Sequence, residues 1–358
     1  MPSPRHDAGG PPPLDDPPPA LVVDGRHQIG SFNAPVPVVN PLDIVTASGW
    51  RGRLARMARD LRMKEWEAFQ LGNDEWFVLG AVYDAKFVGL VMVIAVHQDT
   101  GRILRWIDKL PSTRVSVAHG LQGTASTGGG RTGRLTITNA VDDGRVSLDG
   151  HHRGRHDLPS LRLSGVGDCT AGVAHHLAVC HPFGAGRILY TNKCLMPFSG
   201  ELRIGSEVVA FDGDRSFMIL DDHHGEYPSP LVYDWVTGAC RRGDGSLLGF
   251  NLTNNQVRHP DVYNENVLWA DGGLHRLPAV QFDRPEGVLG PWRVTDAANT
   301  VDVTFTPTVE SSLHVGPRRS LAEYHAPYGR FAGLITTAGH TVSVDGLFGM
   351  GEKKRIRI

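Results

Sequence analysis

Short apolar segments separated by turns dominate the chain from residue 76 onward. Residues 76–98 contain two apolar segments broken near 84–86, and the second is almost wholly apolar, as in a strand buried on both faces. Residues 134–140 and 145–150 instead alternate apolar with polar positions, which is typical of strands with one solvent face. The segments between them are rich in turn-forming residues. This part of the chain is therefore predicted to form strands joined by tight turns.

The second half of the chain repeats the same pattern. Residues 207–220 give two apolar runs around a turn at 212–214, and residues 300–305 alternate apolar with polar side chains. Residues 329–352 read as a strand, a glycine turn and a second strand. Strands of about ten residues with regular turns are typical of antiparallel barrels and sandwiches. The sequence thus predicts an all-β fold.

One helix is predicted, near residues 51–63. Its apolar residues Leu54, Met57, Ala58 and Leu61 have the i, i+3, i+4, i+7 spacing that puts them on one face. Five arginines occupy most of its other positions: Arg51, Arg53, Arg56, Arg59 and Arg62. They are interpreted as a solvated face with carboxylates nearby, and contact with an anionic surface is the alternative.

Residues 1–40 are predicted to be a disordered, proline-rich tail, because their first half is too poor in apolar residues to bury a face. We find no apolar export segment at the N-terminus, so we expect a cytoplasmic protein. The longest apolar run, residues 87–96, is far shorter than the roughly 20 residues that span a bilayer. No membrane span is therefore expected.

The amino-acid composition further narrows the possible fold and the kinds of partner. The chain has 43 glycines and 24 prolines among 358 residues, which favours many turns over a helical bundle. A formal net charge of −2 argues against a nucleic-acid partner. The four cysteines contain no CxxC pair, so they are interpreted as buried free thiols. Composition predicts no oligomeric state.

Residues 221–235 are the densest group of potential catalytic side chains. They follow an apolar segment that looks buried, so we expect them to emerge at the end of a strand, where binding residues often gather. A carboxyl group near aromatic side chains has its pKa raised by desolvation, which would suit Asp222 or Glu226 as a proton donor. His223 or His224 would hold or relay the proton. The alternative is a sharp turn whose polar groups satisfy backbone donors.

The walls of the predicted site are aromatic and amide side chains. Tyr227, Tyr233, Trp235 and Trp292 would shelter a developing cation. Asn251 and Glu265 would orient a ligand if they faced inward across a hairpin, and an ordinary loop role is an equal alternative. No metal site is expected, because adjacent histidines on a strand point to opposite faces and the spacings of zinc sites are missing.

The order of several motifs resembles a known family. The segments KCLMPFSGELRIG, LDDHHGEYP, YDW, GFNLTNN, YNENVLWADGGLHRLPAVQF, PWRV, VDVTFTP and YGRFAGLITTAGHTVSVDGLFGMGE together resemble the domain-of-unknown-function family 2804 from about Asn40 to the C-terminus. That family is similar to a calycin-type group that includes carotenoid hydratases and tocopherol cyclases. The resemblance implies two lipocalin-like β-barrel or β-sandwich domains, which we place at 41–205 and 206–358, with the candidate site in the second.

The leading hypothesis is an acid/base enzyme of the hydratase, isomerase or cyclase type, acting on a small apolar molecule such as an isoprenoid in a barrel cavity. No cofactor is expected, because no GxGxxG stands between a strand and a helix. One rival is a non-catalytic lipid or isoprenoid carrier. The other is a carbohydrate-active hydrolase or lyase, which needs two carboxylates about 5–9.5 Å apart.

Overall fold

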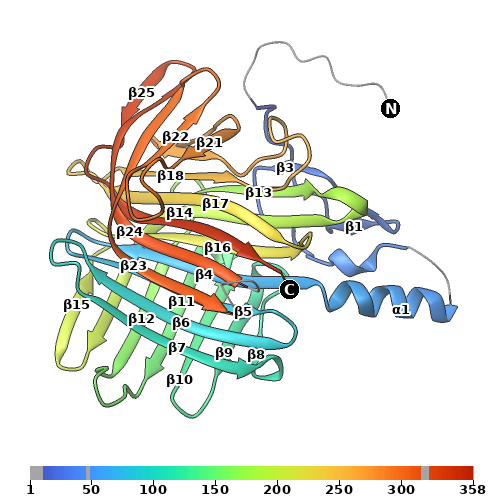
Figure 1. The fold of residues 1–358 in the computed structure, drawn as a ribbon, viewed down its shortest axis with the longest axis horizontal. Coiled ribbons are helices and arrows are strands. Elements are labelled where there is room, and N and C mark those ends of the chain that lie inside the picture. The colour runs from blue at the N-terminus through green and yellow to red at the C-terminus, as the bar shows by residue number, and fades with distance from the viewer. Residues whose placement is uncertain (1–10, 46–48, 316–321, 358) are drawn as a thin grey trace.

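Two large antiparallel sheets make up nearly all of this protein (Figure 1). The computed structural model describes residues 11–45, 49–315 and 322–357. One sheet is a nearly closed barrel and the other a half-barrel. The predicted all-β class with two barrel-like halves is therefore confirmed.

The first sheet has 14 strands and holds the N-terminal part of the chain. Its main path runs β7-β6-β5-β4-β16-β14-β12-β11-β10-β9-β8, and β8 and β9 return to contact β5 and β6, which brings the barrel close to closure. β3 and β13 extend one region of the sheet, and β15 pairs with the far end of β14. The strands are β3 (Gly30–Phe32), β4 (Met63–Gly72), β5 (Trp76–Asp84), β6 (Val88–His97), β7 (Ile103–Pro111), β8 (Val115–Ser116), β9 (Gln122–Gly129), β10 (Gly133–Ala140), β11 (Arg145–His152), β12 (Leu161–Asp168), β13 (His175–Pro182), β14 (Ile188–Ile204), β15 (Glu207–Phe211) and β16 (Phe217–Glu226).

The second sheet has ten strands and curves over one side of the first. Its path runs β20-β19-β18-β17-β26-β24-β23-β22-β21, with β25 paired to β24. The strands are β17 (Leu231–Arg241), β18 (Leu247–Asn254), β19 (Val267–Ala270), β20 (Gly273–Arg276), β21 (Val280–Asp283), β22 (Trp292–Asp296), β23 (Val301–Val315), β24 (Ala322–Thr337), β25 (His340–Ser343) and β26 (Phe348–Ile356). Four short 3-10 helices complete the connections: η1 (Pro41–Asp43), η2 (Ser112–Arg114), η3 (Val141–Asp143) and η4 (Gly184–Gly186).

Strand alternation places most of the buried apolar side chains in three large cores. Because successive residues of a strand point to opposite faces, Met218 and Leu220 of β16 lie inside the first barrel, whereas Phe217 and Ile219 face the second sheet. The core between the sheets includes Phe77, whose ring centroid lies 5.9 Å from that of Tyr328 and 5.9 Å from that of Phe348. A third core fills the second half. The halves are therefore joined through a continuous apolar layer.

The chain leaves the first sheet later than the predicted boundary at 205/206. β16 pairs with β4 on one side and β14 on the other, so it is a central strand of the first sheet. The second sheet begins with β17, after residue 230. The candidate segment thus starts in one sheet and ends in the other. That each half is a separate domain stays a prediction.

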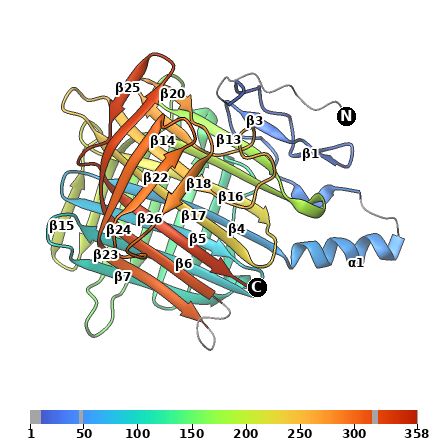
Figure 2. The same ribbon diagram turned by 45° about the horizontal axis from the view of Figure 1, so that its top comes forward.

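The N-terminal segment packs against the first sheet, which corrects part of the predicted tail. Residues 1–10 lie outside the described residues. Residues 11–40 contain a small hairpin of β1 (Val22–Val23) and β2 (Arg26–His27), followed by β3, which pairs with β13. Leu21, Phe32, Val36 and Val39 are buried against β13 and β14. The proline-rich composition of the first 20 residues concealed these later apolar positions. Figure 2 shows this segment on the same side of the molecule as the helix.

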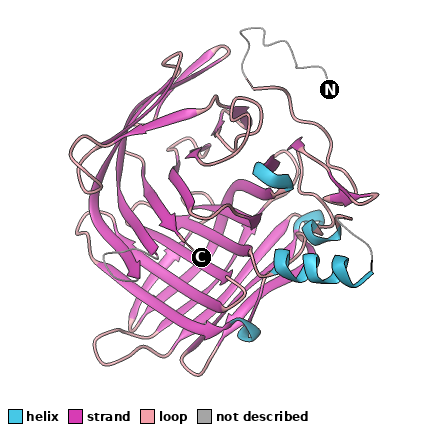
Figure 3. Cartoon of the chain, turned by 45° about the vertical axis from the view of Figure 1, so that its right-hand side comes forward, coloured by secondary structure: helices cyan, strands magenta, loops and turns pink. Residues whose placement is uncertain are grey.

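The one α-helix, α1 (Gly49–Asp60), confirms the predicted element and corrects its orientation. It ends before residue 63 because β4 begins there. Figure 3 shows the helix outside the layer of strands. The apolar face does not join the core: Leu54 is 49% exposed, Met57 56% and Leu61 42%.

Two smaller expectations concern the cysteines and the membrane. All four cysteines are free, and Cys169, Cys180 and Cys194 are buried, in agreement with the interpretation as free thiols. None of the described helices combines the length and the apolar character that crossing a bilayer would demand.

Trp292 lies in the core of the second half rather than beside the other predicted ligand-binding residues. Its side chain is fully buried, its ring centroid lies 5.4 Å from that of Phe305, and its indole N–H donates a hydrogen bond of 2.8 Å to the carbonyl of Val288. The guanidinium of Arg284 lies 4.0 Å from the ring centroid. This environment gives Trp292 a structural role.

Replacing Trp292 by alanine is expected to lower the free energy of unfolding by about 3–5 kcal/mol, since it removes a large buried ring and leaves a cavity. Urea unfolding followed by circular dichroism measures the change. Trp50→Ala is the matched control, because Trp50 is 61% exposed and should cost less than about 0.5 kcal/mol. A Trp292→Ala protein as stable as this control would contradict the assignment.

Candidate functional site

β16 carries the candidate catalytic residues within the strand, not at its end. The strand continues through Glu226 because it pairs along its whole length with β4 and β14, so the polar residues after Leu220 do not form the expected loop. Alternation then separates them. Asp222 and His224 face the interior of the first barrel, while Asp221 and His223 face the second sheet. The single cluster expected from the sequence is therefore two clusters, back to back.

The cluster on the second-sheet side, here called the interface cluster, centres on Lys193, Asp221, His223 and Glu265. Lys193 Nζ lies 2.8 Å from Asp221 Oδ1 and 3.4 Å from Glu265 Oε2. His223 Nδ1 lies 3.2 Å from the same Asp221 oxygen. All four side chains are buried, although Glu265 comes from the loop before β19 and the others from the first sheet. Charged side chains thus join the two sheets.

Electrostatics keep Lys193, Asp221 and Glu265 ionised despite burial. Burial alone would lower the pKa of Lys193, but the carboxylates of Asp221 and Glu265 outweigh it and raise that pKa. Conversely, burial would raise the pKa of Asp221 and Glu265, and the nearby Lys193 ammonium holds both pKa values below their usual range. The pKa of the adjacent His181 is lowered by burial to about 4, so that imidazole is neutral. The cluster offers two carboxylates, one ammonium and two imidazoles.

Aromatic rings surround His223. The Trp66 ring stacks on the imidazole with centroids 4.1 Å apart, and Tyr227 lies roughly parallel to both rings. Beyond them, the hydroxyl of Tyr233 donates a hydrogen bond of 2.6 Å to Glu352 Oε2. Lys354 Nζ lies 4.5 Å from the Tyr233 ring centroid and 5.3 Å from that of Trp66. The rings give His223 an apolar surrounding with polar groups at its edge.

Trp235, Asn251 and Glu265 form a connected wall on the second-sheet side. The indole N–H of Trp235 donates a hydrogen bond of 2.6 Å to Asn251 Oδ1, and Asn251 Nδ2 donates one of 2.8 Å to the carbonyl of Glu265. Lys193 Nζ lies 5.4 Å from the Trp235 ring centroid. Asn251 thus contacts the backbone of Glu265, while the Glu265 side chain contacts Lys193, and a ligand-orienting role for the two residues stays a prediction.

The interface cluster has unused polar atoms and a cavity beside it. Within the described part of the chain, Tyr227 Oη and His181 Nε2 are buried and make no hydrogen bond, and Glu265 Oε2 contacts Lys193 Nζ at the long distance of 3.4 Å. Glu265 also lines a cavity of about 50 Å³. The other residues that line this cavity are Thr253, Asn254, Asn255, Val257, Pro260, Asn264, Ala279, Val280 and Gln281. Buried polar atoms without partners usually bind water or a ligand, so these atoms are candidate contacts for one.

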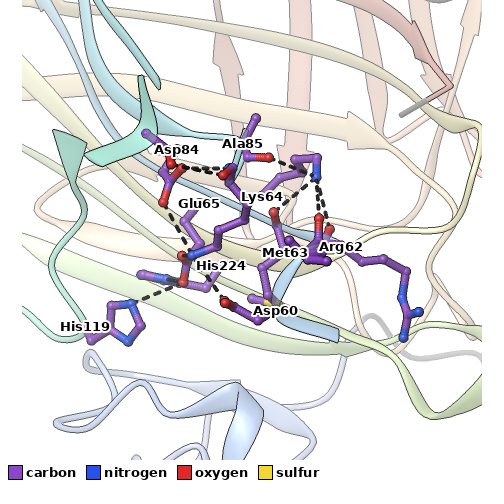
Figure 4. Close-up of polar contacts among 12 residues, drawn as sticks. Asp60, Arg62, Met63, Lys64, Glu65, Asp84, Ala85, His119 and His224 are labelled. Carbon is purple, nitrogen blue, oxygen red and sulfur yellow. Dashed lines mark hydrogen bonds and ion pairs between the residues drawn. The ribbon is translucent and has the colours of Figure 1, made fainter. Parts of the chain in front are cut away.

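The second cluster, here called the inner network, lies inside the first barrel. His224 Nε2 lies 3.0 Å from Asp222 Oδ1, and His224 Nδ1 lies 3.0 Å from Glu65 Oε1. Glu67 is opposite Asp222 in the register of β4 and β16, and it accepts hydrogen bonds from Ser126 and from Asn139. Figure 4 shows His119 and His224 approaching Glu65 from different sides.

The pKa values of the inner network are strongly shifted. Burial and then the charge of Asp222 raise the pKa of Glu67 to about 8, against the hydrogen bonds from Ser126 and Asn139. Burial would lower the pKa of His224, but Asp222 and Glu65 outweigh it and raise the value to about 10. The expected buried acid with a raised pKa is thus Glu67, which the sequence interpretation did not single out.

Glu65, His119 and His224 are the described side chains best placed to hold a cation. One ligand atom from each lies within 4.8 Å of the other two. The second nitrogen of His224 contacts Asp222, as is common for metal-bound histidines. The sequence spacing could not indicate this group, because its members come from β4, the loop after β8 and β16.

Glu226 has a different position from the other predicted catalytic residues. Its Oε2 accepts a hydrogen bond of 2.8 Å from Arg59 Nε, and its Oε1 accepts one of 2.7 Å from Arg62 Nη2. Both oxygens are therefore used in fixing the end of α1 to β16. This geometry favours an anchoring role over proton donation.

The sequence interpretation missed the partly buried Trp66 and the buried Glu67 and Lys193. Glu67 and Lys193 share one signal, a charged side chain inside a segment that also carries large apolar residues, as in residues 63–72 and 188–198. Such residues are rarely buried without a partner, so they could have been paired with residues 221–224 as a hypothesis.

The pH dependence of stability tests the buried Glu67. A carboxyl whose folded pKa is about 8 binds a proton more tightly when folded than when unfolded, so its contribution to stability is lost as pH rises from about 4.5 to 8. Glu67→Gln removes this loss. The unfolding free energy of the variant minus that of the wild type should therefore increase by up to about 1.4 kcal/mol for each pH unit over that range.

Urea unfolding at several pH values measures this difference. His224 also contributes to stability, and because its pKa is raised from 6.5 to about 10, that contribution is lost as pH rises between these values. His224 is present in both the variant and the wild type. Glu75→Gln is the control, since Glu75 is exposed and should follow the wild type throughout. Parallel curves for Glu67→Gln and the wild type would show that Glu67 is ionised in the folded protein.

Comparisons with known proteins concern the whole chain. Among curated protein sequences, none matches it significantly. A crystal structure of kievitone hydratase from Nectria haematococca superposes with a TM-score of 0.46 and 12% sequence identity, covering 82% of this chain and 88% of that one. The sequence profile of the family described as "Domain of unknown function (DUF2804)" matches residues 28–358. This match covers both sheets, and the chain therefore belongs to the DUF2804 family.

Proposed function

We propose that the interface cluster is the active site of an acid/base enzyme that hydrates, dehydrates or isomerises a small, largely apolar molecule. The observation that carries this proposal is the position of His223. One of its nitrogens is held by Asp221, its ring lies against Trp66, and Lys193 and Glu265 lie close by. An imidazole oriented by a carboxylate is a common general acid or base.

Asp221 sets the orientation of the imidazole. Because Lys193 keeps Asp221 ionised, this carboxylate accepts the Nδ1 hydrogen of His223 and favours the tautomer or imidazolium with that hydrogen in place. No hydrogen bond to His223 Nε2 comes from the described residues. Nε2 is therefore the atom that exchanges a proton with a bound molecule.

Glu265 is the proposed base, which accepts a proton when His223 has donated one. It is ionised, its Oε2 lies 3.4 Å from Lys193 Nζ, and it borders the small cavity. A carboxylate so placed can accept a proton from a water molecule that adds to a cation. Lys193 links the two groups, because its Nζ lies 3.4 Å from Glu265 Oε2 and 2.8 Å from Asp221 Oδ1, the oxygen that also contacts His223 Nδ1.

Hydration of a C=C bond in this site would proceed through a carbocation. The imidazolium of His223 gives its Nε2 proton to one carbon of a C=C bond, and a carbocation forms on the other carbon. The faces of Trp66 and Tyr227 stabilise that charge, because aromatic faces attract cations. Water adds to the cation and gives its proton to Glu265. Return of this proton to His223 restores both groups, and the reverse sequence removes water.

The inner network supports β16 from its other face. Asp222 and His224 alternate with Asp221 and His223 along the same strand, and the contact of His224 with Glu65 of β4 ties the two strands together, while Asp222 holds the other nitrogen of His224. This is a positioning role. It leaves the proton transfers to the interface cluster.

The test begins with the molecules that the purified protein retains, identified by mass spectrometry. Retained compounds and a panel of isoprenoid alkenes and alcohols are then incubated with the protein in ¹⁸O-labelled water. We expect ¹⁸O to enter the product. His223→Gln and Glu265→Gln should each lower the rate by about 10²–10⁴-fold, because each removes one placed acid or base. His156→Gln is the control, since His156 is fully exposed.

The outcomes separate the proposal from its rivals. An apolar ligand that binds with no ¹⁸O exchange in the wild type assigns the protein as a carrier. A retained sugar assigns it to carbohydrate chemistry. Full turnover in His223→Gln would remove His223 from the mechanism.

A further inference from the structure

Helix α1 is amphipathic, but its apolar side faces the solvent, unlike that of most surface helices. An ordinary surface helix turns its apolar face to the core and its charged face to water. Here the charged side faces the protein. Arg56 Nη1 lies 2.8 Å from Asp43 Oδ1, and Arg59 Nε lies 2.8 Å from Glu226 Oε2. The apolar side is left in solvent.

The outward face is continuous and large. Trp50, Leu54, Met57 and Leu61 are spaced at i, i+4, i+7 and i+11, which places them along one side of the helix. Trp50 is 61% exposed, and the other three are between 42% and 56% exposed. Single exposed apolar residues are common, but an aligned row of four usually marks a binding surface.

Basic side chains flank this row. Arg51 and Arg53 lie on either side of it, and neither has an ion-pair partner among the described residues. The one acidic residue of the helix, Asp60, lies at its end, 3.6 Å from Lys86 Nζ. The helix therefore presents positive charge beside an apolar row, in a chain whose formal net charge is −2.

Three arginines on the protein side fix this orientation. Glu226 receives Arg59 and Arg62 on its two oxygens, and Glu226 belongs to a central strand of the barrel. Arg56 also donates to the carbonyl of Leu42. The helix is thus held to the protein by its polar side, so burying its apolar row requires an external partner.

We propose that α1 lies in the surface of an anionic lipid bilayer, with Trp50, Leu54, Met57 and Leu61 inserted among the acyl chains and Arg51 and Arg53 at the headgroups. Helices that bind in the plane of a membrane combine a tryptophan- and leucine-bearing face with arginines beside it. The helix does not span the bilayer. This inference does not depend on the reaction proposed above, although a membrane surface would bring apolar molecules to the protein.

Vesicle flotation tests the proposal, with phosphatidylcholine vesicles and with vesicles that also contain phosphatidylglycerol. The wild type should float with the anionic vesicles and much less with the neutral ones. Raising sodium chloride to about 1 M, where the screening length is about 3 Å, should release most of it. Arg51→Gln with Arg53→Gln should weaken binding about fivefold for each arginine removed.

The apolar row is tested with Leu54→Ser and Met57→Ser together, which should reduce binding to anionic vesicles at least tenfold. The matched control is Val208→Ser with Leu334→Ser, because these residues are 51% and 50% exposed on other elements. Lipids brominated on their acyl chains should quench the fluorescence of the wild type and not of Trp50→Phe. Circular dichroism checks that each variant is folded.

Three results would overturn the proposal. The first is equal flotation of the wild type and the Leu54/Met57 variant. The second is equal binding to neutral and anionic vesicles. The third is a wild-type dimer in solution that the Leu54/Met57 variant dissociates, since the apolar row would then be a contact between two copies of this chain. None of these measurements depends on catalytic activity, so the proposed function is tested separately.

Discussion

The ammonium group of Lys193 lies between two carboxylates that belong to different sheets. Asp221 comes from β16 of the barrel, and Glu265 comes from the loop that leads into β19 of the half-barrel. A charge this deeply buried is tolerated only when its partners stay in place, because an unpaired ion in the interior costs several kcal/mol. The apolar layer between the sheets supplies most of their attraction, whereas this ion group fixes how they align.

The alignment determines what the candidate site contains. Trp66 and His223 belong to the barrel, and Trp235, Asn251 and Glu265 belong to the other half. Neither half alone brings the oriented imidazole of His223 and the carboxylate of Glu265 to the same Lys193 ammonium. The aromatic rings and the ion group therefore depend on the same packing of one sheet against the other.

The sequence predicted what local patterns encode. Apolar alternation and turn residues located many of the strands, and the density of polar residues at 221–235 identified the strand that carries the candidate groups. Pairing between distant strands could not be read in this way. Trp66 and Lys193 enter the site because β4 and β14 flank β16, and nothing local to residues 221–235 names those neighbours. The same limit explains why Glu226 and Trp292 were grouped with the site.

The helix shows the other limit of a local pattern. Periodicity identified α1 and its apolar face, but periodicity does not say which face meets the protein. That was decided by Asp43 and Glu226, two carboxylates that hold the arginines on the inner side. An amphipathic pattern therefore predicts a helix more securely than it predicts a core.

The central position of β16 has a consequence for how this chain can vary. The strand has ten consecutive buried residues and neighbours on both edges, so its side chains have no freedom to exchange faces. Inserting or deleting one residue would shift the register by one position and turn every later side chain to the opposite face. Asp222 and His224 would then occupy the space between the sheets, and Asp221 and His223 would enter the barrel. Length changes in this strand should therefore be far less tolerated than substitutions.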